Sequence, residues 1–138
     1  MWDIAREVVS IADACLGGLR GRSALVIGPD ELRRPYAGLL QQAGMKYVYQ
    51  EGTPHTASSI IPHIQLLISI PSPEQRDQML TAASIARGCT GRRTPLLIFD
   101  LAESTSVEEL AGLLPAVCLY TPEDMRYILP AMQVKFAS

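Results

Sequence analysis

Two features in the first half of the chain have the residue types and spacing of a nucleotide site. The turn Gly28-Pro29-Asp30 follows an apolar run at Ala24–Ile27, and Glu51 lies 23 residues after Gly28. Dinucleotide-binding folds carry a G-x-G-x-x-G loop after the first strand and, about 20 residues later, an acidic residue that hydrogen-bonds the adenosine ribose. A carboxylate there fits NAD better than NADP, because it repels a 2′-phosphate. The spacing indicates dinucleotide binding, and an exposed strand-end glutamate is the alternative interpretation of Glu51.

The turn departs from this pattern at two of its three glycine positions. Gly28 is the first glycine, but Asp30 occupies the second position and Arg33 the third. The second glycine lets the backbone approach the pyrophosphate and the third lets the helix pack on the strand, so both changes weaken a phosphate site. Arg33 and Arg34 either turn toward the crevice and offset the repulsion or lie solvated on the helix surface. Binding of a dinucleotide and its loss therefore both stay open.

The histidines and cysteines carry weaker signals. His55 and His63 are eight residues apart with no third ligand at a recognisable spacing, so we expect no metal site. Neither histidine is linked by a motif to a nucleophile, and we assign no catalytic residue. Cys15, Cys89 and Cys118 lie far apart and outside any C-x-x-C arrangement. We interpret them as buried or incidental thiols of a reducing compartment.

Three further polar segments have structural and functional interpretations. Asp100 ends an apolar run, where it either orients a ligand or caps the following loop. Residues 104–106 all carry hydroxyl groups and precede two glutamates, a pattern that favours an N-cap role for one of them at the start of the next helix. Arg87, Arg92 and Arg93 form a basic turn, which we interpret as solvated rather than as a binding surface for an acidic partner.

The elements that position these residues alternate along the chain. We expect strands at Ala24–Ile27, Tyr47–Tyr49, Leu66–Ile70, Pro95–Asp100 and Val117–Tyr120. We expect helices at Trp2–Leu16, Glu31–Ala43, Glu74–Arg87 (with Met79, Leu80, Ala83 and Ala86 inward), Val107–Leu113 and from Pro122 to about Val134, and only a turn at Ser58–Ile64. Short apolar strands separated by helices predict an α/β fold with a parallel sheet covered on both faces.

The ligand crevice of an open parallel sheet lies beyond the carboxyl ends of its strands. The candidate cofactor-binding residues are therefore those at the strand exits, with no metal ligand among them. They are Gly28, Pro29, Asp30, Glu31, Glu51, Ser69, Pro71 and Asp100.

Composition narrows the class of protein. The chain has 138 residues, 48% hydrophobic residues and a formal net charge of −2, which fits one compact domain over residues 1–138 and not a disordered chain. The sequence pI of about 5.6 argues against autonomous nucleic-acid binding. The absence of a long apolar run and the charged first residues argue against a membrane span and a signal peptide, so we expect a cytoplasmic protein.

Four segments, taken in order, resemble one known family. They are Val8–Ala12 with Leu19–Gly28, Leu66–Pro73, Thr94–Ala102 and Leu114–Met125. Together they resemble the NADPH-binding domain of glutamyl-tRNA reductase over most of the chain, with residues 1–18 similar to that family's linker helix and packed on the domain. The resemblance implies a Rossmann-like, three-layer α/β/α fold. A helix and a short strand of the family pattern are missing after the second strand, which leaves a mostly parallel five-stranded sheet in the order 2-1-3-4-5.

The resemblance also implies a function. That family reduces the glutamyl group of glutamyl-tRNA with NADPH, the entry step of tetrapyrrole synthesis, and uses a cysteine nucleophile on a catalytic domain together with a dimerisation domain. Neither domain has a counterpart here, and Gln50-Glu51-Gly52 replaces the family's segment that suits a 2′-phosphate. We expect an NADP- or NAD-binding domain linked to tetrapyrrole metabolism that is not catalytically complete alone. The alternative is a non-catalytic scaffold that has lost dinucleotide binding and acts through a protein partner or a homodimer.

Overall fold

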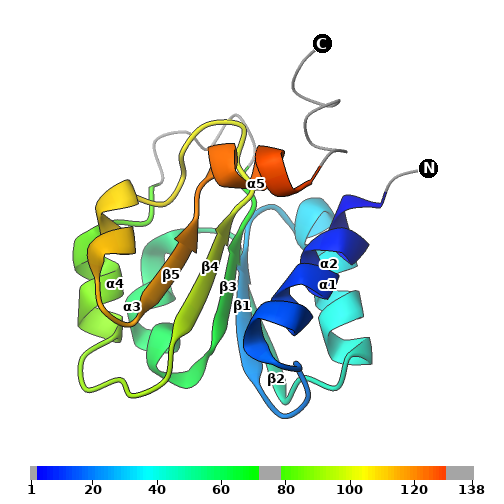
Figure 1. Ribbon diagram of the computed structural model, residues 1–138, viewed down its shortest axis with the longest axis horizontal. Helices are drawn as coiled ribbons and strands as arrows, with labels where there is room; N and C mark the ends of the chain where they lie inside the picture. Colours follow the sequence, from blue (N-terminus) through cyan, green and yellow to red (C-terminus); the bar gives the residue numbers. More distant parts are fainter. Residues whose placement is uncertain (1–2, 72–78, 130–138) are drawn as a thin grey trace.

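A parallel five-stranded sheet forms the centre of the computed structural model, which describes residues 3–71 and 79–129 (Figure 1). The strands are β1 (Ser23–Ile27), β2 (Tyr47–Glu51), β3 (Leu66–Ser69), β4 (Leu96–Asp100) and β5 (Val117–Tyr120). Their order is β2-β1-β3-β4-β5, and neighbouring strands pair in parallel. The strand order and the parallel sheet predicted from the sequence are confirmed.

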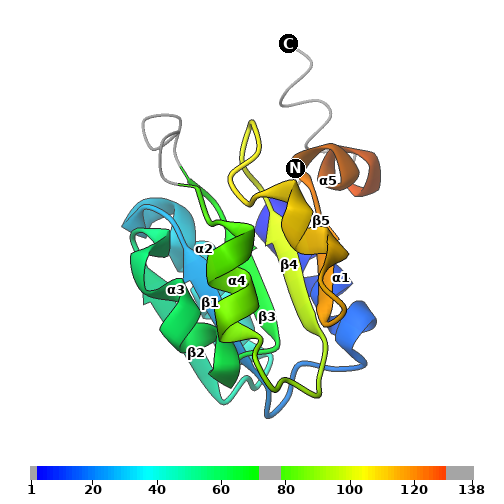
Figure 2. The same cartoon turned by 90° about the vertical axis from the view of Figure 1, so that its left-hand side faces the viewer.

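Helices cover both faces of this sheet, as Figures 1 and 2 show from two directions. One face packs against α1 (Ile4–Leu16), α2 (Asp30–Gln42) and α5 (Pro122–Ile128). The other face packs against α3 (Ala57–Ile60), α4 (Ala82–Gly88) and the 3₁₀ helix η4 (Glu109–Leu113). Two 3₁₀ turns, η1 (Pro54–Thr56) and η2 (Ile61–His63), flank α3. The result is the three-layer Rossmann-like fold that the resemblance implied.

The two layers of the core follow from the alternation of side chains along the strands. In β1, Val26 belongs to the core under α1 and α2, whereas Leu25 belongs to the core under α3 and α4. Ile68 and Leu67 divide in the same way in β3. Because β1, β3 and β4 are buried along their whole length, both faces of these strands must be apolar, and this explains their uninterrupted apolar runs.

Local side-chain chemistry sets both ends of α1. Asp3 is the N-cap, and its carboxylate accepts a hydrogen bond from the backbone N–H of Arg6. At the other end Gly17 adopts a φ of 68°, a left-handed conformation that glycine takes without steric cost. Arg22 then donates to the carbonyl oxygens of Leu16 and Gly18, each at 2.9 Å. These contacts end the helix and direct the chain into β1.

Of the helix expected at Glu74–Arg87, the described residues are helical only from Ala82 onward. Residues 72–78 lie outside the described residues, and α4 starts only at Ala82, after Thr81, whose hydroxyl caps the helix. Leu80 is extended and forms a parallel bridge with Val107 instead. The predicted inward positions are partly wrong as well, because Met79 is 39% exposed and Ala83 is exposed. At residues 79–81, where the helix was expected to continue, the pairing of Leu80 with the distant Val107 takes its place.

Candidate functional site

The turn after β1 lies at the point where the connections from the sheet change direction. From β1 the chain leads to β2 on one side, and β3 lies on the other. The N–H of Gly28 donates to the carbonyl oxygen of Glu51 at 2.9 Å, and the N–H of Ile70 donates to the carbonyl oxygen of Ile27 at 2.7 Å. A Cβ atom on Gly28, whose φ is 153°, would lie 2.5 Å from the carbonyl oxygen of Ile70. Only glycine fits here, because the backbone of Ile70, which follows β3, packs directly against this turn.

The N-terminus of α2 faces this crevice with acidic side chains. The helix begins at Asp30, and the preceding Pro29 gives it no side-chain cap. Asp30 and Glu31 both lie in its first turn. Their carboxylates stabilise the positive end of the helix dipole, the same feature that attracts phosphate in nucleotide-binding folds. Two negative charges of the chain itself therefore compete with a phosphate group at this position.

The Arg33 side chain turns toward the ends of β1 and β2 and contacts three groups there. Its Nη1 donates to the carbonyl oxygen of Gly28 at 2.6 Å, its Nη2 lies 3.2 Å from Oδ1 of Asp30, and its Nε donates to Oε1 of Gln50 at 3.4 Å. The Arg33 side chain is only 16% exposed. The interpretation of Arg33 as a solvated residue is therefore wrong, whereas Arg34, which pairs with Asp30 at 2.6 Å, is 76% exposed.

This guanidinium group lies between the ends of β1 and β2. Besides its contact with Gln50 of β2, its Nη1 is 4.0 Å from the position that a Cβ on Gly52 would take. In dinucleotide-binding folds the adenosine ribose binds beyond the end of this second strand. Arg33 therefore lies beside the strand end at which folds of this kind bind the ribose, and its charge is partly balanced by Asp30. Gly28 agrees with the glycine pattern of dinucleotide-binding folds, whereas Asp30 and Arg33 occupy its other two glycine positions, and Glu31 adds a second carboxylate to the first turn of α2.

Glu51, the candidate ribose ligand, is held by its own loop. It ends β2, opposite Ile27 of β1, and is half-buried. Oε1 of its carboxylate accepts a hydrogen bond from the hydroxyl of Thr56, in the η1 turn. Thr53 accepts a hydrogen bond from the backbone N–H of His55 in the same segment. The carboxylate thus takes part in ordering the turn after β2.

On the other side of β1, Asp100 lies in a buried network. Its Oδ2 accepts from the N–H groups of Ser106 and Val107 at 2.8 and 2.9 Å, and its Oδ1 accepts from the Ser106 hydroxyl at 2.6 Å and from the N–H of Ala102 at 3.2 Å. Ser69 lies 3.0 Å from the Ser106 hydroxyl. Burial raises the pKa of Asp100, and these hydrogen bonds oppose the shift. These contacts are those of a residue that closes the loop after β4.

The expected N-cap at residues 104–106 is wrong for the same reason. Ser106 is buried and bonds to Asp100, while η4 follows Glu108, which has no side-chain capping bond. Glu108 instead accepts a hydrogen bond from the N–H of Ala82 at 3.2 Å and so supports the start of α4. The hydroxyl pattern could not reveal that a strand-end carboxylate would compete for Ser106.

The candidate residues therefore fall into two groups. Gly28, Pro29, Asp30 and Glu31 form the turn after β1 and the start of α2, and Glu51 ends the neighbouring strand β2; of these residues, Gly28 and Asp30 contact the Arg33 side chain. Ser69 and Asp100 are buried near the ends of β3 and β4, and half-buried Pro71 follows β3. The remainder of that exit loop, including Ser72 and Pro73, lies outside the described residues. Arg33 was not among the candidate cofactor-binding residues expected from the sequence.

Arg92 is also engaged rather than solvated. Its guanidinium group donates to the carbonyl oxygens of Thr94 at 2.6 Å, Ile61 at 2.9 Å and Pro95 at 3.2 Å, and also to that of Ile64. Burial lowers the pKa of Arg92. The side chain fastens the turn after α4 to the end of η2, so the interpretation of Arg92 as part of a solvated basic turn is wrong.

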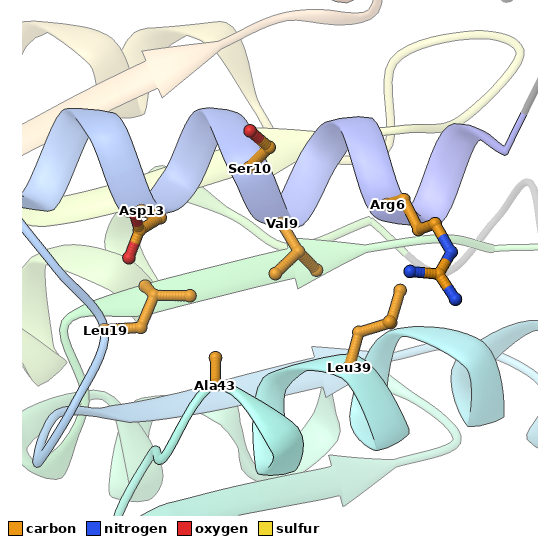
Figure 3. A pocket seen from close by; sticks show the side chains of 7 residues that line it. All are labelled: Arg6, Val9, Ser10, Asp13, Leu19, Leu39 and Ala43. Atoms are coloured by element: carbon orange, nitrogen blue, oxygen red, sulfur yellow. The ribbon is translucent and has the colours of Figure 1, made fainter.

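A separate hollow opens between α1 and α2 (Figure 3). It has a volume of about 270 Å³, an apolar floor that includes Val9, Leu19 and Leu39, and the charged side chains of Arg6 and Asp13 at its rim. Leu19 precedes β1, so this hollow belongs to the helical layer and not to the carboxyl ends of the strands.

Two further properties concern residues 3–71 and 79–129. No helix there combines the length and apolar character that crossing a membrane requires. In the same ranges, no three His, Cys, Asp or Glu side chains gather into a group suited to a metal ion. His55 lies in η1 and His63 in η2.

A doubly wound parallel sheet with a glycine turn at its switch point defines a Rossmann-like α/β protein. The chain is 26% identical to the glutamyl-tRNA reductase of Methanospirillum hungatei, over 91% of this chain and 35% of that protein. The resemblance found in the sequence is confirmed, and the chain spans about a third of the length of this relative. No family model matches the chain.

Solved structures agree on the fold. The glutamyl-tRNA reductase from Methanopyrus kandleri matches with a TM-score of 0.75 at 19% identity, over 98% of this chain and 38% of that one. The methylenetetrahydrofolate dehydrogenase-cyclohydrolase of Trypanosoma brucei, solved with an NADP cofactor and an inhibitor, matches with a TM-score of 0.65 at 17% identity, over 96% of this chain and 48% of that one. At these identities the likeness establishes the fold alone.

Proposed function

We propose that this chain acts in tetrapyrrole synthesis as the nucleotide domain of a glutamyl-tRNA reductase-like protein, with a dinucleotide crevice that its own Arg33 holds closed. The similarity to a glutamyl-tRNA reductase over 91% of the chain supports the first part. The observation that carries the second part is the guanidinium group of Arg33, which joins Gly28, Asp30 and Gln50.

Binding of NADP or NAD would require this closed arrangement to open. The pyrophosphate would approach the turn at Gly28 and the first turn of α2, as in other folds of this kind. Arg33 would have to leave the carbonyl oxygen of Gly28, and its released guanidinium group would then be a cation beside the phosphates. Asp30 would still oppose a phosphate in the same place. We expect weak binding by the wild-type chain, with a Kd above about 100 μM.

The reduction itself would depend on residues outside the crevice described above. A thioester-forming cysteine must reach both the substrate and the nicotinamide ring. Cys15 lies on α1, Cys89 follows α4 and Cys118 lies within β5, so none of them is at the exits of β1 and β2. We therefore assign this chain a nucleotide-domain role that is not catalytic alone, in one domain over residues 1–138.

Calorimetric titration with NADPH and, separately, NADH tests this proposal. The double variant Asp30→Gly with Arg33→Ala removes the opposing carboxylate and the occupying guanidinium group. We expect it to bind dinucleotide at least tenfold more tightly than the wild type, about 1.4 kcal/mol. A preference for NADH would implicate Glu51. No heat of binding from either folded protein, at dinucleotide concentrations well above 1 mM, would contradict the nucleotide role.

One observation favours a second candidate, a non-catalytic scaffold. Asp30 pairs with both Arg33 and Arg34, at 3.2 and 2.6 Å, so the charged groups at the start of α2 are engaged with one another rather than left for a phosphate. A domain of this kind would act through a protein partner or a second copy. Silence of the double variant toward both dinucleotides, together with a concentration-dependent dimer in light scattering, would favour the scaffold.

A further inference from the structure

Two cysteines that are 103 residues apart in the sequence approach the same tyrosine. Cys15 lies near the end of α1, and its Sγ is 3.9 Å from the hydroxyl oxygen of Tyr120 in β5. Cys118 lies two residues before Tyr120 in the same strand, so the side chains of Cys118 and Tyr120 point to the same face of the sheet. That face is the one covered by α1, because Tyr120 packs against Phe99 of the α1-side core at a ring separation of 5.3 Å.

The electrostatic surroundings of Tyr120 involve both thiols. Its pKa is raised to about 12, first by the hydrogen bond with Cys15, then by burial, and further by the charges of Cys15 and Cys118 and a hydrogen bond with Cys118. The phenol is therefore a common neighbour of the two sulfur atoms. Tyr120 is itself half-buried and packs against the α1-side core, so the two thiols meet it at the margin of that core.

Both thiols are also accessible to reagents. Cys15 and Cys118 are exposed, whereas Cys89 is half-buried and packs against the opposite core, under α3 and α4. Burial raises the pKa of Cys89, which lowers its thiolate fraction at neutral pH. An oxidant therefore meets two accessible sulfurs on one side of the sheet and a less reactive one on the other.

We propose that Cys15 and Cys118 form a dithiol site that closes into a disulfide when the chain meets a low-molecular-weight disulfide such as oxidised glutathione. The thiolate of Cys118 attacks glutathione disulfide, which forms a mixed disulfide and releases one glutathione. The thiolate of Cys15 then attacks the Cys118 sulfur, forms the protein disulfide and releases the second glutathione. Two electrons and two protons leave the protein, and they reduce one glutathione disulfide to two glutathione molecules.

The bond would fasten α1 to β5, an edge strand of the sheet. It would close a loop that contains most of the chain, so the oxidised protein should unfold at a higher temperature than the reduced protein. The site is independent of the proposed nucleotide role, because neither cysteine contributes to the crevice at Gly28. The disulfide between Cys15 and Cys118 would thus be a redox-responsive crosslink between the first helix and the sheet.

Equilibration in glutathione buffers of graded potential tests the proposal directly. After alkylation of remaining thiols, we expect a monomer that has lost two hydrogen atoms and a proteolytic fragment in which Cys15 is linked to Cys118. The variants Cys15→Ser and Cys118→Ser should lose this product, and the matched control Cys89→Ser should keep it. Glutathione adducts without a linked fragment, a linkage that includes Cys89, or crosslinked dimers would overturn the proposal.

Phenylarsine oxide provides a second measurement that needs no variant and no oxidant. It condenses with two neighbouring thiols to form two arsenic–sulfur bonds and one water molecule. The reduced wild-type chain should bind one equivalent, and mapping should locate it on Cys15 and Cys118. Failure to bind, or binding through Cys89, would show that the two exposed thiols do not act as a pair.

Discussion

The same substitution, Gly→Ala, is expected to have opposite effects at two helical positions. Gly88 is the last residue of α4, where a Cβ atom would lie 2.7 Å from Cβ and 2.8 Å from Cγ2 of Ile61, and 3.0 Å from the carbonyl oxygen of Ser58. Ile61 is fully buried, and these contacts are with its rigid branch and with backbone rather than with a flexible chain end. Gly38, within α2, has open space in this direction.

The magnitudes follow from these contacts. Gly88→Ala forces α3 and α4 apart, at a cost of about 1–3 kcal/mol for overpacking, of which the higher helix propensity of alanine recovers less than about 1 kcal/mol. We therefore expect a net loss of about 1–2 kcal/mol. Gly38→Ala gains the propensity term without a clash and should stabilise the protein by roughly 0.5–1 kcal/mol.

Urea denaturation and thermal melting followed by circular dichroism measure both effects. For a domain of this size, 1 kcal/mol corresponds to roughly 3–5 °C in Tm, so the two variants should separate by several degrees in opposite directions from the wild type. Equal shifts, or a stabilised Gly88→Ala variant, would refute the close packing of α4 against Ile61 and with it the arrangement of this helical layer.

Three further predictions concern residues around the strand ends. Arg92→Ala should lower the free energy of unfolding by about 1.5–3 kcal/mol, because a charged donor to four carbonyl oxygens is lost. The control Arg93→Ala, at an exposed neighbouring residue, should change the free energy of unfolding by less than about 0.5 kcal/mol in the same denaturation experiment. Burial raises the pKa of Asp100 in the folded state, so the stabilisation from its protonated form is fully present below the unfolded pKa and is lost as pH rises through the folded pKa. The free energy of unfolding of the wild type, relative to that of Asp100→Asn, should therefore fall between acid and neutral pH. A difference that stays constant with pH would contradict the raised pKa. Gly28→Ala should destabilise the fold by more than about 2 kcal/mol, since its Cβ meets a backbone oxygen at 2.5 Å, and a neutral result in thermal melting would contradict the close approach of β1 and β3.

The strands were the most predictable part of the fold. In β1, β3 and β4 both faces are buried, so apart from Ser23, Ser69 and Asp100 at the strand ends every position is apolar, and the apolar run itself marks the strand. The strand order required more than periodicity, because it came from the resemblance of ordered segments to a known family. The glycine at the switch point was also predictable, since its spacing from the apolar run and from Glu51 is a local pattern.

The parts that could not be predicted depend on contacts between distant segments. The helix expected through Leu80 is replaced by a bridge to Val107, and no periodicity within residues 74–87 signals that pairing. Arg92 reaches carbonyl oxygens about 30 positions earlier in the chain. Such partners become visible only when the turn after α4 and the end of η2 are placed side by side.

Arg33 illustrates the same limit within the candidate site. Its position at the third glycine of the motif indicated interference, but its direction depends on how α2 is rotated against β2. Gln50 offers an acceptor 17 residues away, and Asp30 and the carbonyl oxygen of Gly28 complete the set. Nothing in the local sequence showed that the Arg33 side chain, unlike that of its neighbour Arg34, turns toward Gly28 and Gln50.

The most direct test of the closed crevice is a paired calorimetric titration of Arg33→Ala and Arg34→Ala with NADPH. Both variants lose one positive charge near α2, but only Arg33→Ala removes a guanidinium group that contacts Gly28 and Gln50. We expect Arg33→Ala to bind NADPH about tenfold more tightly than Arg34→Ala. Equal affinities in the two folded variants, or weaker binding by Arg33→Ala, would show that Arg33 does not close a nucleotide site.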